Sequence, residues 1–459
     1  MNNSTTFSVN IDVSASNNIN SVASAWNVAV VGGGIGGLVV SYWLAKAGAR
    51  VTVYEASDQP GGLGTFFQYR SVYLERFYHC MLPSDLYLLK VLDELGLINE
   101  VYWKETSFGF MQNSKLYGLN TPFELLKFGP LSLVDRIRVG LTGLWGRICS
   151  PNGLDNVTCV EWLSKLSGKR AFETFWKPML QAKFGDRYHK VPALWFWTRF
   201  NREKGGKREC KGYIHGGYRR IIETLVKAIE ENGGTVRLNA LIKKLDLAEN
   251  GQLAVYNTYD KFQLYDRVVV TAPISFLHKS MANGQLAKTA AQVDAEIDMQ
   301  GVINAVFMLR RSLTKHYWVA AIDEEILFQG IVESTNLLNK TDTAGAHMIY
   351  VMNYVHRTDS LFHQKDDEIL QTYTDGLKRL FPDFNDEDVI DRFIFRAPYV
   401  EPLYTTGYLQ RKPPTILLSG KLYLATTAQV YPEVTSWNGT IGLARKVVDE
   451  MLSENVRTL

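Results

Sequence analysis

Residues 27–55 read NVAVVGGGIGGLVVSYWLAKAGARVTVYE. The apolar run Asn27–Val31 predicts a buried parallel strand, and the glycine-rich turn after it leads into a helix predicted over Leu38–Ala47. Arg50–Tyr54 predicts a second strand, which ends at Glu55. The stretch therefore predicts a strand–helix–strand unit, which is the building block of a doubly wound α/β sheet.

The glycines of this unit have separate roles. Gly32 allows a tight turn, Gly34 lets the backbone approach a pyrophosphate, and Gly37 lets the helix pack closely on the strand. The helix N-terminus presents unpaired N–H groups and the positive end of its dipole to phosphates. A carboxylate at position 55 is well placed to accept the two hydroxyls of an adenosine ribose. We therefore predict that a dinucleotide is bound by Gly32, Gly34, Ile35, Gly36, Gly37, Glu55 and Ala56.

A second glycine cluster, Gly61, Gly62 and Gly64 with Leu63 between them, follows the ribose carboxylate. It suits a cofactor that runs further along the protein, as FAD does, and we predict that all four residues contact FAD. From this point the chain resembles the flavin-containing amine oxidase superfamily, which includes phytoene desaturases, protoporphyrinogen oxidases and, more distantly, UDP-galactopyranose mutases. Members often carry an arginine after the glycine pair, so the resemblance implies that this contact is missing at Leu63.

Two later segments carry the same resemblance. Residues 437–442, WNGTIG, open a predicted helix after the strand predicted over 421–426, and this resembles the last FAD segment of the family. A helix N-terminus there favours negative charge on the flavin. In the middle of the chain, the strand predicted over 267–271 returns to the cofactor domain. The resemblance implies FAD contacts by Ile242 (at the adenine), Ala272, Ala428, Asn438, Gly439, Thr440 and Ile441.

The order of these segments predicts an α/β protein. We expect a Rossmann-like FAD-binding domain built from three chain segments and interleaved with an α+β substrate domain. The FAD-binding domain is assigned to residues 26–81, 205–275 and 412–459, and the substrate domain to residues 82–204 and 276–411. Residues 1–25 are rich in Ser, Asn and Thr, and we expect them to form a disordered leader. Active sites favour the junction of two such domains.

The composition argues against several other functions. A formal net charge of +3, with 21% charged residues, gives no reason to expect a nucleic acid partner. The four cysteines are far apart and no pair has CxxC spacing, so we predict no metal site and reduced thiols. No apolar run reaches the roughly 18 residues of a spanning helix, and we expect a cytoplasmic protein. The amphipathic residues 123–145 leave two interpretations open: contact with a membrane surface, or a helix packed on the substrate domain.

The resemblance also bears on the reaction. In amine oxidases a lysine near the flavin assists reoxidation by oxygen, and the matching position here is Asn304. One member of the aromatic pair that sandwiches the amine would match Thr440. Simple amine oxidation is therefore disfavoured. We predict an oxidoreductase that removes hydride from a C–C or C–N unit of a hydrophobic small molecule. The alternative is a non-redox flavoenzyme, such as a sugar-nucleotide mutase or isomerase that uses reduced FAD. A flavin-binding protein without turnover is the least favoured.

Catalytic candidates follow from position alone. Arg76 and His79 come soon after the second glycine cluster and can hold an anionic group or move a proton, although a surface arginine and a structural histidine fit equally well. Tyr404, in a polar aromatic stretch, is the third candidate. The aromatic residues within 195–200 either fill a helical core or line a pocket for a large apolar substrate. Blocks at 73–79 and 396–402 resemble a bacterial branch that is often called protoporphyrinogen-oxidase-like.

Overall fold

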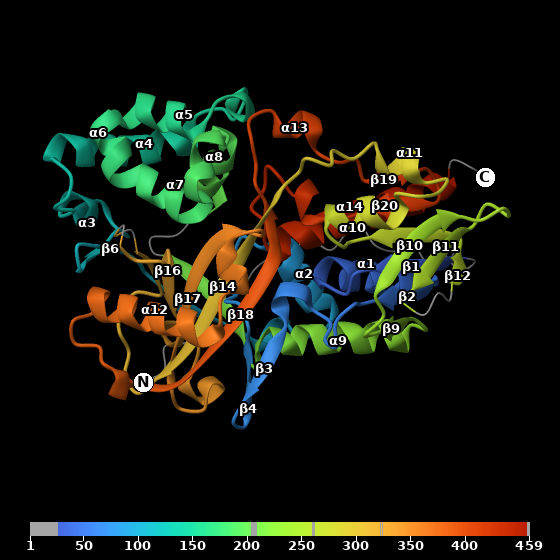
Figure 1. The fold of residues 1–459 in the computed structure, drawn as a ribbon, viewed down its shortest axis with the longest axis horizontal. Coiled ribbons are helices and arrows are strands. Elements are labelled where there is room, and N and C mark those ends of the chain that lie inside the picture. Colours follow the sequence, from blue (N-terminus) through green and yellow to red (C-terminus); the bar gives the residue numbers. More distant parts are fainter. Residues whose placement is uncertain (1–25, 203–208, 259–261, 322, 324, 457–459) are drawn as a thin grey trace.

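The computed structural model describes residues 26–202, 209–258, 262–321, 323 and 325–456. The predicted leader, residues 1–25, lies outside the described residues. Two sheets of different construction organise the molecule, one on each side of Figure 1, and a group of helices stands above the left-hand sheet.

The right-hand sheet has six strands in the order β19–β20–β13–β1–β2–β9. All pairs are parallel except β19 with β20. Their bounds, in that order, are Ile416–Leu418, Leu422–Leu424, Arg267–Val270, Asn27–Val31, Arg50–Tyr54 and Thr235–Arg237. Strands from three separate parts of the chain therefore meet in one sheet, which confirms the predicted α/β fold class.

Helix α1 (Ile35–Lys46) is buried on nearly every side, because it lies between β1 and two further helices, α9 (Gly217–Glu231) and α14 (Trp437–Val456) (Figure 1). Gly37 makes its close approach to the sheet possible, since a Cβ there would lie 1.9 Å from the carbonyl oxygen of Gly32. The helix starts at Ile35, one turn earlier than the sequence predicts, so the glycines themselves form its first turn.

The left-hand sheet has seven strands in the order β18–β14–β17–β16–β15–β6–β7. Their bounds, in that order, are Val389–Pro402, Met299–Leu309, His347–His356, Gly330–Glu333, Trp318–Ala321, Phe108–Gln112 and Lys115–Gly118. Every residue of β14 is buried, and helix α12 (Asp366–Leu380) packs on one face of the sheet. The apolar runs 302–309 and 348–354 of the sequence lie within β14 and β17.

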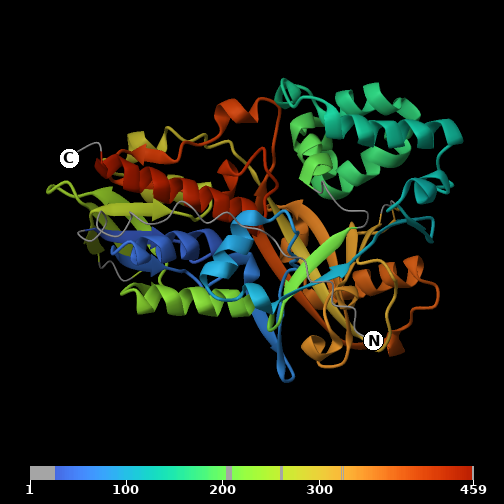
Figure 2. The same ribbon diagram turned by 180° about the vertical axis from the view of Figure 1, so that it is seen from behind.

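Residues 82–199 contain short strands as well as helices. Strands β6 and β7 join the left-hand sheet, and β5 (Val101–Glu105) pairs with β8 (Cys210–Ile214), which Figure 2 shows near the centre of the molecule. These strands are short, and two of them, β5 and β6, have partners far away in the sequence, so local pattern gives little sign of β5 and β6.

The remaining elements complete the two halves. The helical group above the left-hand sheet comprises α3 (Pro122–Leu126), α4 (Leu133–Ile148), α5 (Cys159–Ser167), α6 (Lys169–Ala171), α7 (Lys177–Phe184) and α8 (Ala193–Arg202). Elsewhere lie β3 (Phe66–Tyr69), β4 (Val72–Glu75), β10 (Ile242–Leu247), β11 (Leu253–Asn257), β12 (Phe262–Tyr265), α2 (Leu86–Glu94), α10 (Ile274–Met281), α11 (Ala287–Ala290) and α13 (Tyr408–Arg411). Within the described ranges, no helix combines the length and apolar character needed to traverse a bilayer.

Candidate functional site

A cavity of 2320 Å³ is lined by residues from both halves of the molecule. Pockets for drug-sized ligands typically measure about 300–1,000 Å³, so this cavity has room for more than one such molecule. One end is formed by the glycine-rich turns of the six-stranded sheet. The other end is formed by aliphatic side chains of α7 and aromatic side chains of α8. The cavity lies at the junction where the sequence places an active site.

The two glycine clusters meet backbone against backbone at the first end. Gly61 donates its N–H to the carbonyl oxygen of Gly33 at 2.7 Å, and a Cβ on Gly62 would lie 3.2 Å from the Cα of Gly34. Gly34 itself has an ordinary φ of −70°. A Cβ on Gly34 would meet only the Gly62 Cα, at 3.9 Å. Neither backbone conformation nor packing therefore requires glycine at position 34, and the space beside it is open to a ligand.

Gly32 and Glu55 shape the same turn. Gly32 has a φ of +113°, in the region that favours glycine, and a Cβ there would lie 2.6 Å from Thr271 Oγ1. The Glu55 carboxylate accepts the Gly33 N–H at 2.7 Å through one oxygen and the Ser57 hydroxyl at 2.7 Å through the other. The second oxygen also accepts the Ser57 N–H at 2.9 Å, so the oxygen that binds Gly33 is the one with acceptor capacity left, and Glu55 lines the cavity. The carboxylate is thus available to accept hydroxyl groups of a ligand.

Helix α14 begins on the same wall. A Cβ on Gly36 would lie 2.9 Å from Thr440 Cγ2, so the first turns of α1 and α14 are in contact. Both helix N-termini open onto the cavity, and the positive ends of their dipoles favour a negatively charged ligand. The Asn438 side chain also holds the first turn of α2, because its Oδ1 accepts the N–H groups of Tyr87 at 2.9 Å and Leu88 at 3.2 Å.

Most of the predicted cofactor residues share the cavity wall. The lining includes Gly32, Gly34, Ile35, Gly36, Gly37, Glu55, Ala56, Gly61, Gly62, Leu63, Ile242, Ala272, Asn438 and Thr440. Gly64, Ala428, Gly439 and Ile441 lie outside it. Ala428 and Ile441 are buried in the core, and a Cβ on Gly64 would lie 2.5 Å from the Trp437 ring. Contact with a cofactor stays a prediction for the residues that line the cavity and for these four.

Arg76 and Asn304 lie together on the wall between the two ends. Asn304 is 1% exposed and donates its Nδ2 to the carbonyl oxygen of Arg76 at 2.7 Å. Asn304 Oδ1 and Arg76 Nε are buried and have no hydrogen-bond partner among the described residues. Buried polar atoms without partners cost stability and are uncommon. They therefore mark a place where polar atoms of a ligand fit.

His79 lines the cavity as a neutral imidazole. Burial lowers the pKa of His79 to about 4. Its Nδ1 lies 2.8 Å from the carbonyl oxygen of Phe77, which only accepts hydrogen bonds, so Nδ1 carries the proton. The ring packs against Tyr218 and Trp437, with centroids at 4.8 and 5.6 Å. At neutral pH His79 is therefore unsuited to hold an anion and is held in place by its neighbours.

Aromatic and aliphatic side chains form the second end of the cavity. They include Phe108, Leu119, Trp176, Met179, Leu180, Trp195, Phe196 and Phe200. Trp176 packs edge-on against Phe196 and Phe200, with ring centroids at 5.4 and 6.0 Å. The sequence allowed two interpretations of the aromatic stretch 195–200, a helical core or a pocket lining. In the structure this stretch fills the core of the helical group and also lines the cavity.

A polar cluster interrupts the aromatic end. Lys183 forms an ion pair with Glu401, and its ammonium lies 3.4 Å from the centre of the Tyr354 ring. Burial raises the pKa of Tyr354 to about 12, so the phenol is neutral at physiological pH. The Arg199 guanidinium stacks 3.2 Å from the centre of the Trp195 ring, and burial lowers the pKa of Arg199 to about 10, which leaves it cationic. Sequence reasoning missed this cluster, because its members come from distant segments with no shared motif.

Tyr404 does not reach the cavity. It is buried, lies 2.9 Å from Thr435 Oγ1 through its hydroxyl, and packs against Tyr408 and Tyr431 with ring centroids at 4.9 and 4.8 Å. Burial raises the pKa of Tyr404 above its ordinary value. Of the three catalytic candidates, the structure brings Arg76 and His79 to the cavity and gives Tyr404 a place in a packed aromatic cluster.

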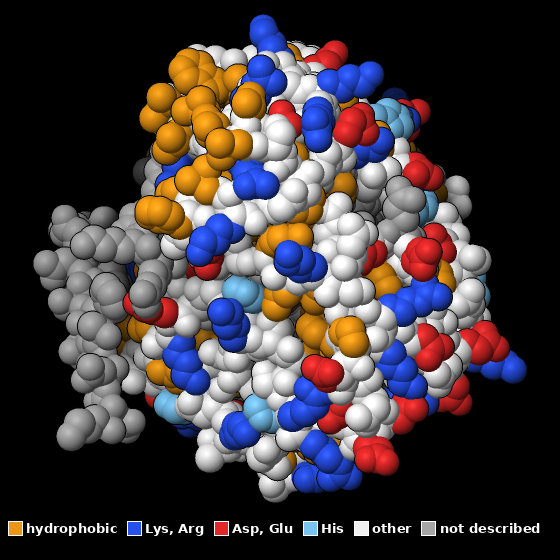
Figure 3. All heavy atoms as spheres, turned by 90° about the vertical axis from the view of Figure 1, so that its left-hand side faces the viewer, with side chains coloured by type: hydrophobic (Ala, Val, Ile, Leu, Met, Phe, Trp, Pro, Cys, Tyr) orange, Lys and Arg blue, Asp and Glu red, His pale blue; other side chains and the backbone are white. Residues whose placement is uncertain are grey.

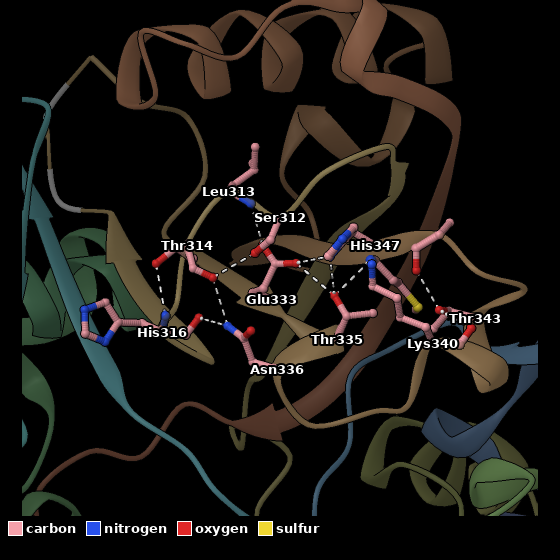
Figure 4. A network of polar contacts seen from close by, with 12 residues as sticks. Ser312, Leu313, Thr314, His316, Glu333, Thr335, Asn336, Lys340, Thr343 and His347 are labelled. Carbon is pink, nitrogen blue, oxygen red and sulfur yellow. Dashed lines mark hydrogen bonds and ion pairs between the residues drawn. The ribbon is translucent and has the colours of Figure 1, made fainter.

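A second buried polar cluster surrounds Glu333, away from the cavity (Figure 4). The Glu333 side chain is fully buried, and its oxygens accept the Leu313 N–H and the Thr335 hydroxyl, each at 2.9 Å. His347 Nδ1 lies 4.0 Å from the carboxylate. Burial raises the pKa of Glu333 to about 7. The cluster ties the loop before β15 to β16 and contributes to stability. No trio of His, Cys, Asp or Glu side chains in the described ranges is grouped to hold a metal ion.

Comparison with known proteins adds a family match. The model of the family described as "Flavin containing amine oxidoreductase" matches residues 35–451 of this chain. Among curated proteins, the 15-cis-phytoene desaturase of Solanum lycopersicum is 25% identical over 54% of this chain. That match covers 46% of the desaturase, so the chain spans about half the length of this relative.

Several solved structures have a fold similar to that of this chain. A putative protoporphyrinogen oxidase from Exiguobacterium sp. 255-15 has a TM-score of 0.75 at 15% identity, and the match covers 94% of this chain and 100% of that one. Reduced UDP-galactopyranose mutase has a TM-score of 0.74 at 14% identity, with 94% and 96% covered. At these identities the likeness shows the fold alone.

Proposed function

Because the chain belongs to the family of flavin containing amine oxidoreductases, we propose that it binds FAD at the glycine end of the cavity and oxidises a hydrophobic small molecule at the aromatic end. One observation carries this proposal: a single cavity of 2320 Å³ joins an open glycine cradle to an aromatic wall, with unpartnered polar atoms between them.

The residues present fit FAD. The open space beside Gly34 and the N-terminus of α1 suit a pyrophosphate, and the Glu55 carboxylate suits the adenosine ribose. The N-terminus of α14 offers positive potential to the flavin. Arg76 Nε offers a hydrogen-bond donor, and Asn304 Oδ1 offers an acceptor. When bound, FAD supplies two-electron oxidation, in which hydride leaves a carbon atom of the substrate.

The protein residues contribute position and exclusion of water. The aromatic wall takes an apolar substrate out of solvent, which strengthens the remaining polar interactions. The neutral Tyr354 phenol and the cationic Arg199 offer hydrogen bonds to a polar group of the substrate. Asn304 neither takes up nor releases a proton at physiological pH, unlike a lysine, and this supports dehydrogenation or desaturation over simple amine oxidation.

The test begins with the purified chain. We expect visible flavin absorbance, and release of FAD rather than FMN on denaturation, identified by chromatography. An anaerobic screen of lipid, porphyrin, amine and sugar-nucleotide compounds should then bleach the flavin with an apolar substrate. A colourless protein that cannot take up FAD would refute the proposal, and so would bleaching by hydrophilic amines alone.

A non-redox reaction of a sugar nucleotide is the second candidate. The likeness to UDP-galactopyranose mutase and the cations Arg76 and Arg199 on the cavity wall support it, since arginines bind diphosphates well. Arg357 does not line the cavity and pairs with Asp298 at 3.5 Å. The two candidates differ in electron balance: a mutase turns over only with pre-reduced flavin and consumes no electrons, whereas the oxidoreductase reduces its flavin with each substrate molecule.

A further inference from the structure

Helix α4 presents its apolar face to solvent. Positions 133, 134, 137, 141, 144, 145 and 148 are exposed, and all are Leu, Val, Ile or Trp. At about 100° per residue they fall in one sector of about 120°. The buried positions lie on the opposite side and hold Asp135, Val139, Thr142 and Gly146. This is the reverse of an ordinary surface helix, whose apolar stripe faces the core.

Helix α3 extends the same surface. Phe123 is 76% exposed and Leu126 is 40% exposed. Arg136 of α4 donates its guanidinium to the carbonyl oxygens of Leu126 and Leu131, which fixes α3 against α4. Figure 3 shows the resulting hydrophobic patch on one face of the molecule. We call this surface, residues 123–148, the α3–α4 face. Soluble monomers rarely expose contiguous apolar patches of this kind without a partner.

Cations border the α3–α4 face. Lys127, Arg138 and Arg147 are exposed beside the apolar stripe, and Arg170 of α6 lies close to Arg138 through their common contact with Asp135. The two acidic residues of the face are already engaged. Asp135 binds Ser132 and the two arginines, and Glu124 accepts N–H groups of the turn before α3. The free charge at the border is therefore positive.

We propose that the α3–α4 face docks on an anionic lipid surface, with its apolar side chains below the headgroups and its lysine and arginines at the phosphates. An apolar stripe with basic residues at its border is the pattern of helices that lie in a membrane interface, and Trp145 is the residue type enriched there. A symmetric second copy fits less well, because it would bring arginines against arginines.

Docking places the cavity beside the lipid. Arg147 belongs to α4 and lines the cavity, and Phe200, which lines it too, packs under α4 so closely that a Cβ on Gly146 would lie 2.4 Å from its ring. An apolar substrate dissolved in lipid would thus reach the aromatic end by a short path. This consequence rests on the proposed function, whereas docking itself is measured without substrate.

The experiment compares lipid binding by matched variants of the full chain. Leu141→Gln/Leu144→Gln removes two side chains that are 58% and 60% exposed, without adding charge. Leu86→Gln/Phe262→Gln removes two that are 59% and 53% exposed elsewhere on the surface. Each protein is mixed with vesicles of phosphatidylcholine containing or lacking phosphatidylglycerol, and the bound fraction is measured by flotation. Thermal unfolding of each protein is measured to check that all variants are folded.

We expect wild type and the Leu86/Phe262 variant to float with anionic vesicles, and the Leu141/Leu144 variant to need at least about tenfold more lipid for half binding. Added salt should weaken binding to the anionic vesicles. Equal binding by all three proteins, or no binding by wild type, overturns the proposal. So does light scattering that shows a wild-type dimer and a Leu141/Leu144 monomer, because a second copy would then cover the face.

Discussion

Replacing Gly34 with alanine separates cofactor binding from folding. At most glycines of the cradle a Cβ would strike protein atoms, but at Gly34 it meets only the Gly62 Cα, at 3.9 Å, and the backbone conformation is ordinary. Without FAD, the Gly34→Ala variant should therefore unfold at the same urea concentration as wild type. The added methyl group would occupy the space where we place the FAD pyrophosphate, so the variant should bind FAD much more weakly.

The magnitude follows from linkage between binding and unfolding. At a FAD concentration about 100 times its Kd, binding stabilises wild type by about 2.7 kcal/mol. If the methyl group weakens binding about a hundredfold, the same FAD concentration stabilises Gly34→Ala by only about 0.4 kcal/mol. Urea unfolding with and without FAD measures both values, and a titration of flavin fluorescence gives Kd directly.

The control is Gly143→Ala in α4, where a Cβ meets nothing within 4 Å. It should keep the full FAD-dependent stabilisation and gain about 0.5–1 kcal/mol without ligand, because alanine favours a helix interior. Wild-type FAD affinity in Gly34→Ala would refute the placement of the pyrophosphate. If Gly34→Ala is less stable than wild type in the absence of FAD, the claim that the fold does not require glycine at position 34 is wrong.

Three other changes test the surrounding structure. Gly37→Ala should destabilise the unliganded protein by more than about 3 kcal/mol in urea, since its Cβ would lie 1.9 Å from the Gly32 carbonyl oxygen; a stable variant would contradict the packing of α1. Asn304→Ala should cost about 1–2 kcal/mol, because it leaves the Arg76 carbonyl without its donor, and unchanged stability would argue against that bond. Burial raises the pKa of Glu333 from an ordinary 4.5 to about 7, so the folded protein holds a proton that the unfolded chain releases. Relative to Glu333→Gln, wild type should lose about 3 kcal/mol of stability as pH rises from about 4.5 to 7; parallel stability curves for the two proteins would contradict this.

The glycine end of the cavity was predictable because its signals are local. Strands β1 and β2 have the predicted bounds, since each is an apolar run that ends at a glycine or an acidic residue. The meeting of Gly34 with Gly61 and Gly62 agrees with the pairing of β1 and β2, because one glycine cluster follows each of these two neighbouring parallel strands. Strands β5 and β6 were not predictable in this way, because β5 pairs with the distant β8 and β6 pairs with the distant β15.

The aromatic end of the cavity was not predictable from the sequence, for a different reason. The cluster of Lys183, Arg199, Tyr354 and Glu401 exists only once α7, α8, β17 and β18 have packed, and none of these residues predicts another. The same limit applies to α4. Its sequence is amphipathic, and this pattern alone fits both a helix packed by its apolar side and a helix that lies on a membrane surface. The structure shows that the apolar side of α4 is exposed. The opposite side of the helix, which carries small and polar residues, packs against Phe200. An exposed apolar face in an otherwise well-packed chain therefore indicates a binding partner. An anionic lipid surface is the partner that matches both the apolar side chains of this face and the positive charges at its border.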